Sequence, residues 1–229
     1  MEINLATHSF GLGFGKALIG EGGQSHATRL NDPKNVKTDL FRKMQRATED
    51  LVHHMTNYTT ATAALNTWCA ERLHPHDSRI TASILVDETV PVDMYNGILA
   101  IQAGELLRYR RVVLKWGHTA VSEAENWYLP DRLPPLMRWQ MRHSNRPFGQ
   151  IIHPLQPRRT TIQRYSNDDL ELSTRRGQEW INAPKTPPEF SPLQDFALHI
   201  RAIMTTGTGM IIAELREHYR KSLLPLPAQ

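Results

Sequence analysis

Arg110 stands in a run of residues with the alternation of a β-strand, and its place in that run suggests a chemical role. In the stretch LLRYRRVVLKWGH, residues 106–118, alternate side chains share a face, so Arg110 lies in line with Val112 and Leu114. These two apolar residues indicate a face turned toward the core. A guanidinium buried there without an anion is strongly destabilising. The sequence therefore predicts that Arg110 binds a carboxylate, either of the protein or of a ligand.

Glu214, near the C-terminus, has the same kind of position. Met210, Ile212 and Glu214 alternate along a second predicted strand, so Glu214 is also expected to point toward apolar residues. One interpretation is a buried ion pair between Glu214 and Arg110 that fixes the order of the strands. The other is the polar floor of a pocket, where Arg110 holds an anionic ligand. There Glu214, its pKa raised by burial, would bind a hydroxyl or move a proton.

Other candidates for chemistry are weaker. His74 and His76 flank Pro75, but their spacing matches no strong metal signature, and no Ser or Cys stands in a nucleophile elbow. The glycines of 11–23 do not follow a strand, and no Ser or Thr follows Lys16, so the phosphate-loop pattern fails. We predict no metal site and no nucleotide site.

The segment 132–164 contains many arginines and no acidic residue, but it does not resemble a nucleic-acid surface. Its only aromatic residues are Trp139 and Phe148, too few to stack on successive bases, and the net charge of the whole chain is only +4. We expect a solvated basic face, with some arginines at the mouth of an anion pocket, and no nucleic-acid partner.

The composition indicates one globular domain without disulfides. The chain has 229 residues, of which 40% are hydrophobic and 22% charged, so it can bury a core. Its one cysteine, Cys69, lies in an apolar helical run typical of a buried thiol. No stretch has the pattern of a signal peptide or the roughly 20 apolar residues that span a membrane. We expect a cytoplasmic protein with no membrane partner.

Helical and strand patterns alternate along the chain in a way that indicates fold class. Apolar spacing predicts helices over 39–55, 60–73 and 136–142. Alternation predicts a strand at 79–87 and two hairpins, which turn at 116–118 and 206–209. Helices followed by hairpin-connected strands predict an α+β fold with an antiparallel sheet.

Two further segments fall outside these patterns. Residues 1–38 are glycine-rich and polar and predict a flexible N-terminal arm, so the domain would comprise 39–229. The proline-rich stretch 172–194 predicts a long loop within that domain.

Three stretches occur in a particular order: LRYRRVVLKWGHTAVSEAENWYLPDRL, then RPFGQIIHPLQPRRT, then GTGMIIAELREHY. In that order and spacing, residues 56–222 resemble the chorismate pyruvate-lyases and the related UTRA ligand-binding domains. The resemblance implies the chorismate lyase-like fold, an antiparallel sheet of about six strands with flanking helices, and a site without cofactors. It implies that Arg110 binds the ring carboxylate and Glu214 the ring hydroxyl of the substrate. Backbone amides of two ligand-covering flaps would lie at Ala61 and Phe148.

The chain departs from the family pattern in two places. Where the family enzyme carries a further arginine, this sequence reads Glu125-Asn126-Trp127. The positive charge expected to bind the second carboxylate of chorismate is thus missing at this position, and Arg158 or Arg108 could substitute for it, although nothing in the sequence requires that. Ala61 is small, so the pocket would accept a larger ligand.

Three functions follow from this resemblance. The first is a lyase that eliminates pyruvate from chorismate to give 4-hydroxybenzoate, with Arg110 and Glu214 orienting the substrate. The second is a lyase, cyclase or isomerase that acts on another hydroxylated carboxylic acid in secondary metabolism. The third is a non-catalytic UTRA-like ligand-binding module. In each case the partner is a small aromatic or cyclic carboxylic acid, and the protein is a monomer or homodimer.

Overall fold

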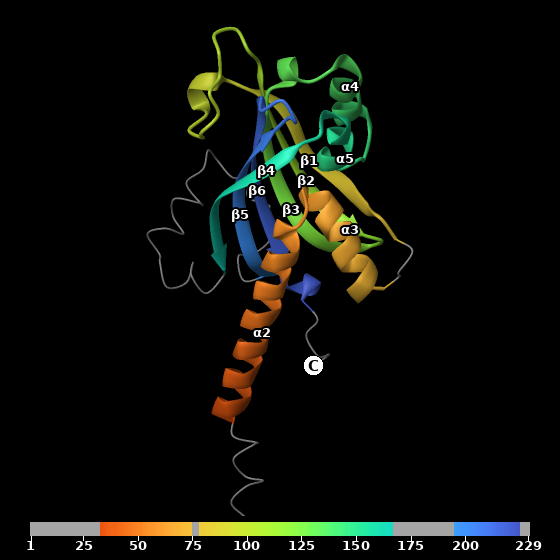
Figure 1. Ribbon diagram of the computed structural model, residues 1–229, viewed down its shortest axis with the longest axis vertical. Helices are drawn as coiled ribbons and strands as arrows, with labels where there is room; N and C mark the ends of the chain where they lie inside the picture. The colour runs from red at the N-terminus through yellow and green to blue at the C-terminus, as the bar shows by residue number, and fades with distance from the viewer. Residues whose placement is uncertain (1–32, 75–77, 167–194, 225–229) are drawn as a thin grey trace, which may run out of the picture. The chain divides into compact units, whose positions relative to one another are not determined.

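Six strands form one antiparallel sheet in a computed structural model that describes residues 33–74, 78–166 and 195–224. The strand order is β1-β2-β3-β6-β5-β4 (Figure 1). The strands are β1 Ile80–Val90, β2 Leu107–Trp116, β3 Thr119–Tyr128, β4 Arg158–Ser166, β5 Phe196–Thr205 and β6 Ile211–Arg220. The two predicted hairpins are β2–β3 and β5–β6, and the predicted α+β fold class is confirmed.

Within the described residues, four α-helices accompany the sheet: α2 Pro33–Thr56, α3 Ala61–Arg72, α4 Pro135–His143 and α5 Phe148–Ile151. Helix α2 begins before the expected start at residue 39, because Pro33 suits the first turn of a helix, where its missing N–H needs no partner. The chain divides into two compact units, Met1–Phe41 and Arg42–Gln229. Residues 1–32 and the predicted loop at 172–194 lie outside the described residues, so the flexible arm and the long loop stay predictions.

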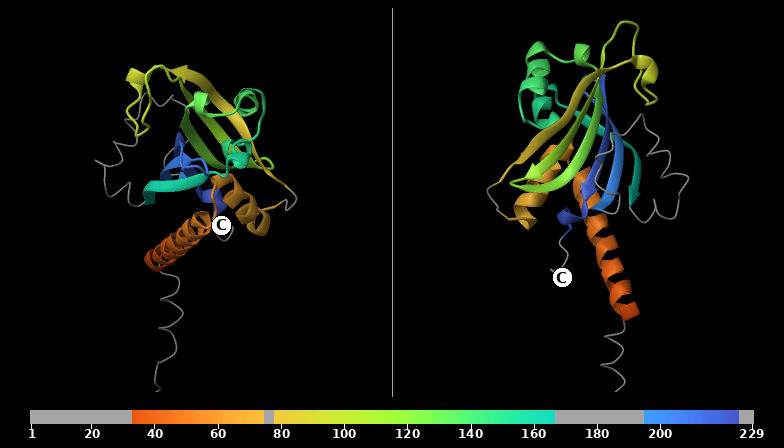
Figure 2. Two further views of the ribbon diagram at one scale, coloured as in Figure 1. Left: turned by 45° about the horizontal axis from the view of Figure 1, so that its top comes forward. Right: turned by 180° about the vertical axis from the view of Figure 1, so that it is seen from behind.

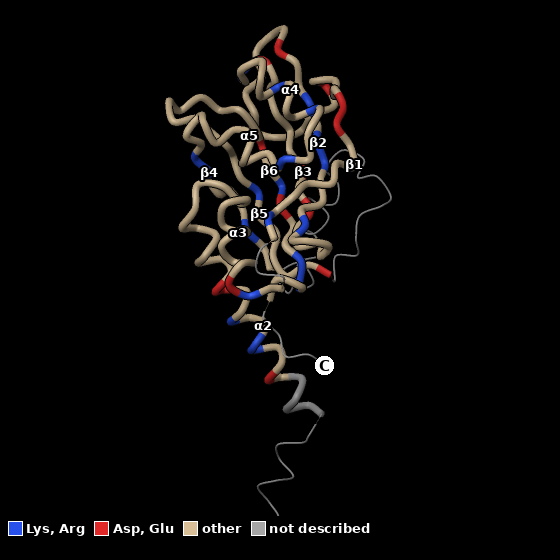
Figure 3. The backbone as a smooth tube through the Cα atoms, turned by 90° about the vertical axis from the view of Figure 1, so that its right-hand side faces the viewer, with Lys and Arg blue, Asp and Glu red and all other residues tan. Residues whose placement is uncertain are grey.

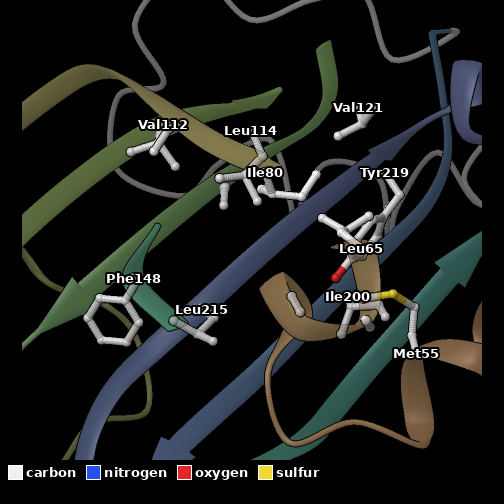
Figure 4. Close-up of a cluster of buried hydrophobic side chains, with 14 of the residues drawn as sticks. Met55, Leu65, Ile80, Val112, Leu114, Val121, Phe148, Ile200, Leu215 and Tyr219 are labelled. Atoms are coloured by element: carbon white, nitrogen blue, oxygen red, sulfur yellow. The ribbon is translucent and has the colours of Figure 1, made fainter. Parts of the chain in front are cut away.

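The main core lies between one face of the sheet and the helices α3, α4, α5 and the part of α2 after Arg42 (Figures 1 and 2). Alternate strand residues point into it, among them Val112 and Leu114 of β2 and Leu215 of β6 (Figure 4). Trp68 of α3 is buried, and its indole N–H donates to the carbonyl of Leu223 at 2.9 Å. We call this side of the sheet the helix-side face.

The opposite face carries a second, smaller apolar cluster. Segment 91–106, which includes the short 3-10 helix Val92–Met94, packs over it. The buried members of this cluster are Leu99, Leu107, Tyr109, Trp127, Leu129 and Ile203. We call this side the far face.

β-bulges interrupt four of the five strand pairs, and two of them decide which side chains share a face. In β5–β6, Met204 pairs with Ala213 but Thr205 pairs with Ile211, which leaves Ile212 as an extra residue. In β2–β3, Leu114 pairs with Ser122 but Lys115 pairs with Ala120, which leaves Val121 extra.

The two edge strands, β1 and β4, are bulged as well. The first has its extra residue between Ile84 and Val86, and the second has it between Thr161 and Gln163.

No helix in the described part of the chain is long and apolar enough to cross a lipid bilayer.

Candidate functional site

Arg110 and Glu214 project from opposite faces of the sheet. Arg110 pairs with Asn126 and Asn126 with Leu215, which places all three on the helix-side face. Glu214 pairs with Trp127 and lies on the far face. The expectation that Arg110 and Glu214 face each other across a pocket is therefore wrong. The expectation failed because β6 has a bulge at Ile212, which breaks the alternation of side chains between Ile212 and Glu214.

Glu214 is fully buried, and donors from four residues contact both of its carboxylate oxygens. Oε2 accepts from the hydroxyl of Tyr95 at 2.5 Å and from the amide of Ile98 at 2.8 Å. Oε1 accepts from Nε of Arg201 at 2.8 Å and from Nε of Arg216 at 3.4 Å. Burial alone would raise the pKa of Glu214, but the hydrogen bonds from Arg201 and Tyr95 bring it below its usual range. The expectation that the pKa of Glu214 is raised is thus wrong. Instead, the hydrogen bonds of Glu214 to Tyr95 and Ile98 hold segment 91–106 against the sheet.

Arg110 is fully buried and has few partners. Its Nη2 donates to the carbonyl of Arg146 at 3.3 Å, and its Nε lies 3.9 Å from Oδ2 of Asp87. Asp87 is bound more closely by Arg108, whose Nη2 lies 2.6 Å from Oδ1. Two guanidinium groups thus share one carboxylate. Burial lowers the pKa of Arg110, and its buried Nη1 has no hydrogen-bond partner in the described part of the chain.

Asn126 presents a second unsatisfied donor beside Arg110. The two residues are cross-strand partners, and Nδ2 of Asn126 is buried without a hydrogen-bond partner among the described residues. Sequence reasoning named Asn126 only as a departure from the family pattern. A regular hairpin with the same turn would pair Arg110 with Glu125, and only the bulge at Val121 brings Asn126 opposite. The sequence therefore held no clear signal for this pair.

Asn126 lines a cavity of about 30 Å³ between the sheet and the helices. Two residues expected at ligand-covering flaps, Ala61 and Phe148, line the same cavity. Figure 4 shows Phe148 beside Leu215, with Val112 on the neighbouring part of the sheet. The other lining residues are Thr60, Thr62, Leu114, Ala124, Pro147, Gly149, Met204 and Glu217.

Glu217, three positions after Glu214 in β6, is the carboxylate that reaches this cavity. Its Oε2 accepts from Nη1 of Arg159 at 2.7 Å and from the hydroxyl of Tyr219 at 2.8 Å. No described residue donates a hydrogen bond to its Oε1. Sequence reasoning missed Glu217 because the alternation was counted through Ile212 without a bulge. Arg159 balances its charge, so this end of the cavity is close to neutral.

A shallower depression of about 350 Å³ adjoins the cavity and shares Thr60, Thr62 and Gly149 with it. The contact between these three residues is very close. A Cβ atom placed on Gly149 would lie 2.9 Å from Cβ of Thr60 and 3.0 Å from Oγ1 of Thr62. Glycine at 149 therefore lets α5 approach the start of α3, and this contact separates the cavity from the outer depression.

The two remaining arginines expected to bind ligand lie elsewhere. Arg158 is exposed at the start of β4 and does not line the cavity. Arg108 is paired with Asp87. Among the described residues there is no group of three or more His, Cys, Asp or Glu side chains that could hold a metal ion, and His76 lies outside them.

The site as a whole is a small cavity between the sheet and its helices. Asn126, which has an unsatisfied donor, lines it, and Arg110 is the cross-strand neighbour of Asn126 without lining the cavity itself. No family model matches the chain. The protein y4mC of Sinorhizobium fredii (strain NBRC 101917 / NGR234) is 29% identical over 174 residues, which cover 74% of this chain and 71% of that protein.

Solved structures with similar folds come from bacterial regulators. PhnF from Mycobacterium smegmatis is 14% identical with a TM-score of 0.42, and the match covers 73% of this chain and 66% of PhnF. The ligand-binding domain of a GntR-family transcriptional regulator from Bordetella bronchiseptica is 13% identical with a TM-score of 0.39, covering 66% of this chain and 89% of that one. The C-terminal domain of the histidine utilization repressor from Pseudomonas syringae pv. tomato is 11% identical with a TM-score of 0.37. The match covers 66% of this chain and 98% of that domain.

The prediction of a lyase enzyme is wrong. The similar solved structures named above are transcriptional regulators and their domains. The pair on which the expected reaction depended, Arg110 and Glu214, is also divided between the two faces of the sheet.

Proposed function

We propose that this chain is a non-catalytic module that binds a small carboxylic acid between the sheet and helices α3 and α5. The observation that carries the proposal is the pair of buried donors, Nη1 of Arg110 and Nδ2 of Asn126, which lack hydrogen-bond partners within the described residues. Leaving a buried donor unpaired costs about 1–3 kcal/mol. A ligand carboxylate that accepts from both groups removes this penalty.

The charge balance of the helix-side face favours the same ligand. Arg108 and Arg110 share the single carboxylate of Asp87, which leaves one positive charge uncompensated in this group. A ligand carboxylate would neutralise it through charge-assisted hydrogen bonds. The N-terminus of α3 at Ala61, which lines the cavity, adds the positive end of a helix dipole.

Besides a carboxylate, the proposed ligand needs a hydrogen-bond donor, because Oε1 of Glu217 can accept one. Asn126 pairs with Leu215, so Glu217 is its diagonal neighbour, at a Cβ distance of ~7–8 Å. Oε1 of Glu217 would accept from a hydroxyl or amino group at the end of the ligand away from the acid. The ligand would thus be a small aromatic or cyclic acid with a hydrogen-bond donor, because a second carboxylate would offer no donor to Oε1.

Binding requires the cavity to enlarge. A volume of about 30 Å³ is close to that of one water molecule in the liquid. The contact between Gly149 and the two threonines of α3 would have to open, which joins the cavity to the outer depression.

Titration calorimetry with 4-hydroxybenzoate, 4-aminobenzoate, benzoate and terephthalate tests the proposal. We expect the hydroxy and amino acids to bind most tightly and terephthalate to bind least. Asn126→Leu should weaken the binding of 4-hydroxybenzoate by about tenfold or more, which corresponds to the ~1.4 kcal/mol of one hydrogen bond to a charged group. Arg158→Gln, an exposed arginine outside the cavity, is the control. The proposal fails if none of the four acids binds, or if Asn126→Leu binds them as the wild type does.

A further inference from the structure

A groove lies between helix α2 and the part of the sheet formed by β4 and β5. Its volume is about 510 Å³, which falls in the range of roughly 300–1,000 Å³ that is typical of sites for small molecules. No described residue lines both this groove and the cavity that contains Asn126. The groove is therefore a separate feature of the fold, and we call it the α2 groove.

The floor of the α2 groove is apolar. Ala197 and Leu198 of β5 are buried, and Met44 and Val52 of α2 are partly buried against the main core. All four side chains line the groove. An aliphatic group that lies on them leaves water for an apolar surface, which favours binding.

The two walls of the α2 groove carry opposite charge. Arg164 of β4 pairs with Ile200, a core residue of β5, so Arg164 also projects from the helix-side face toward α2. Glu49 and His53 lie four positions apart on α2, a spacing that places both side chains on one face of the helix. Figure 3 shows charged positions of both signs along α2. The sheet wall thus offers a guanidinium, and the helix wall offers a carboxylate.

Arg164 and Glu49 line the same groove without pairing with each other. Both side chains are exposed, and neither forms an ion pair or a hydrogen bond with any residue in 33–74, 78–166 or 195–224. The groove therefore keeps two charges of opposite sign apart over an apolar floor. A molecule with an anion at one end, a cation at the other and an aliphatic body between them would contact all three parts.

We propose that the α2 groove binds a short zwitterion with an aliphatic body, such as a dipeptide that has both ends free. Arg164 would hold the carboxylate and Glu49 the ammonium group, each through charge-assisted hydrogen bonds. The aliphatic side chains would pack on Val52 and Leu198, and the hydroxyl of Thr48, which also lines the groove, would bond a peptide group. A simple carboxylic acid would leave Glu49 without a partner, so this groove selects a different class of molecule from the cavity.

Titration calorimetry of the full chain with L-leucyl-L-leucine tests this proposal. Two blocked forms of the same dipeptide are the comparison ligands: N-acetylation removes the ammonium group, and C-terminal amidation removes the carboxylate. We expect the dipeptide with free ends to bind about threefold or more tightly than either blocked form, because each loses one charged contact.

Two substitutions assign the preferences to their side chains. Glu49→Gln should abolish the preference for the free amine and keep the preference for the free carboxylate, and Arg164→Gln should do the reverse. Asp50→Asn and Arg158→Gln are the matched controls, because they lie on α2 and β4 outside the groove and are also exposed. Both controls should bind all three peptides as the wild type does.

The proposal is overturned if L-leucyl-L-leucine does not bind, or if both blocked forms bind as tightly as the free dipeptide. It is also overturned if Glu49→Gln and Arg164→Gln keep the preferences of the wild type. Adding 4-hydroxybenzoate at saturation separates this site from the cavity: the dipeptide should bind as before, and competition between the two would place the dipeptide in the cavity. Glu49→Gln should bind 4-hydroxybenzoate as the wild type does, so either site can fail without the other.

Discussion

Glu214 and Glu217 lie three positions apart in β6, and their carboxylates project from opposite faces of the sheet. Glu214 binds Tyr95 and Ile98 on the far face, whereas Glu217 lines the cavity on the helix-side face. On the same strand, Glu214 therefore holds segment 91–106 in place, and Glu217 forms a polar part of the cavity wall near the proposed ligand. Substitutions at the two positions should have separable effects.

Glu214→Gln should destabilise the fold and leave the cavity intact. The amide cannot accept from Tyr95, Ile98 and Arg201 as the carboxylate does, so we expect the free energy of unfolding to fall by about 1–3 kcal/mol. Hydrogen exchange should accelerate at the amides of 95–99 before it does in the sheet. Glu71→Gln, at an exposed surface ion pair, should change neither measurement. Unchanged exchange at 95–99 would show that Glu214 does not hold the segment.

Asn126→Leu should stabilise the protein without ligand. Replacing an unpaired buried donor by an apolar side chain of similar size removes a desolvation penalty, so we expect a gain of about 1 kcal/mol in urea denaturation. Asn66→Leu is the matched control, because its Nδ2 donates to the carbonyl of Thr62 and its Oδ1 accepts from the amide of Ile80. The control should lose stability. A loss of stability in Asn126→Leu as well would mean that its amide is satisfied in solution.

Gly149→Ala should destabilise the folded protein, because the added methyl group would crowd the start of α3. Its Cβ would lie 2.9 Å from Cβ of Thr60, so α5 and the start of α3 must move apart, at about 1–3 kcal/mol. Gly104→Ala provides the comparison, because no atom lies within 4 Å of its added Cβ and only its φ of +87° is unfavourable. We expect Gly149→Ala to lower the midpoint of chemical denaturation more than Gly104→Ala does. The reverse order would show that the contact is not tight.

His199 should make stability depend on pH. Burial, together with the neighbouring His218, lowers the pKa of His199 to about 3. The unfolded chain, where the pKa is ~6.5, therefore binds more protons between these values, and stability falls as the pH drops below about 6.5. The slope approaches ~1.4 kcal/mol per pH unit for one such group.

His199→Asn should reduce that slope when the free energy of unfolding is measured at pH 7, 6 and 5. His118→Asn, in the exposed turn between β2 and β3, is the control and should keep the wild-type slope. An equal slope in wild type and His199→Asn would mean that His199 titrates normally in the folded protein.

Regular elements were predictable from the sequence, and the bulges were not. Arg110 shares the helix-side face with Val112 and Leu114 as expected, because β2 is regular over these residues. The bulge at Ile212 depends on how β6 pairs with β5, and no local residue pattern announces it. Because of that one extra residue, Glu214 lies on the far face rather than the predicted core face, and Glu217, which does face the core, was not predicted.

The candidate site, too, was predictable only where its residues do not depend on a bulge or on long-range contacts. The resemblance in the sequence placed Ala61 and Phe148, and both line the cavity, although their binding role stays a prediction. Asn126 could not be found, because the bulge at Val121 shifts the hairpin register by one residue. Segment 91–106 was also beyond prediction, since its position depends on long-range bonds to Glu214 and Arg132 rather than on its own pattern.

The bulges in β1 and β4 bear on how the protein behaves at high concentration. A flat outer strand offers its backbone amides and carbonyls to any strand it meets, and this is a common route to fibrils. An extra residue in each outer strand interrupts that row of backbone groups and twists it away from a straight template. Growth of the sheet by addition of foreign strands is thereby hindered on both sides, and the molecule should stay dispersed where a smooth-edged sheet would aggregate.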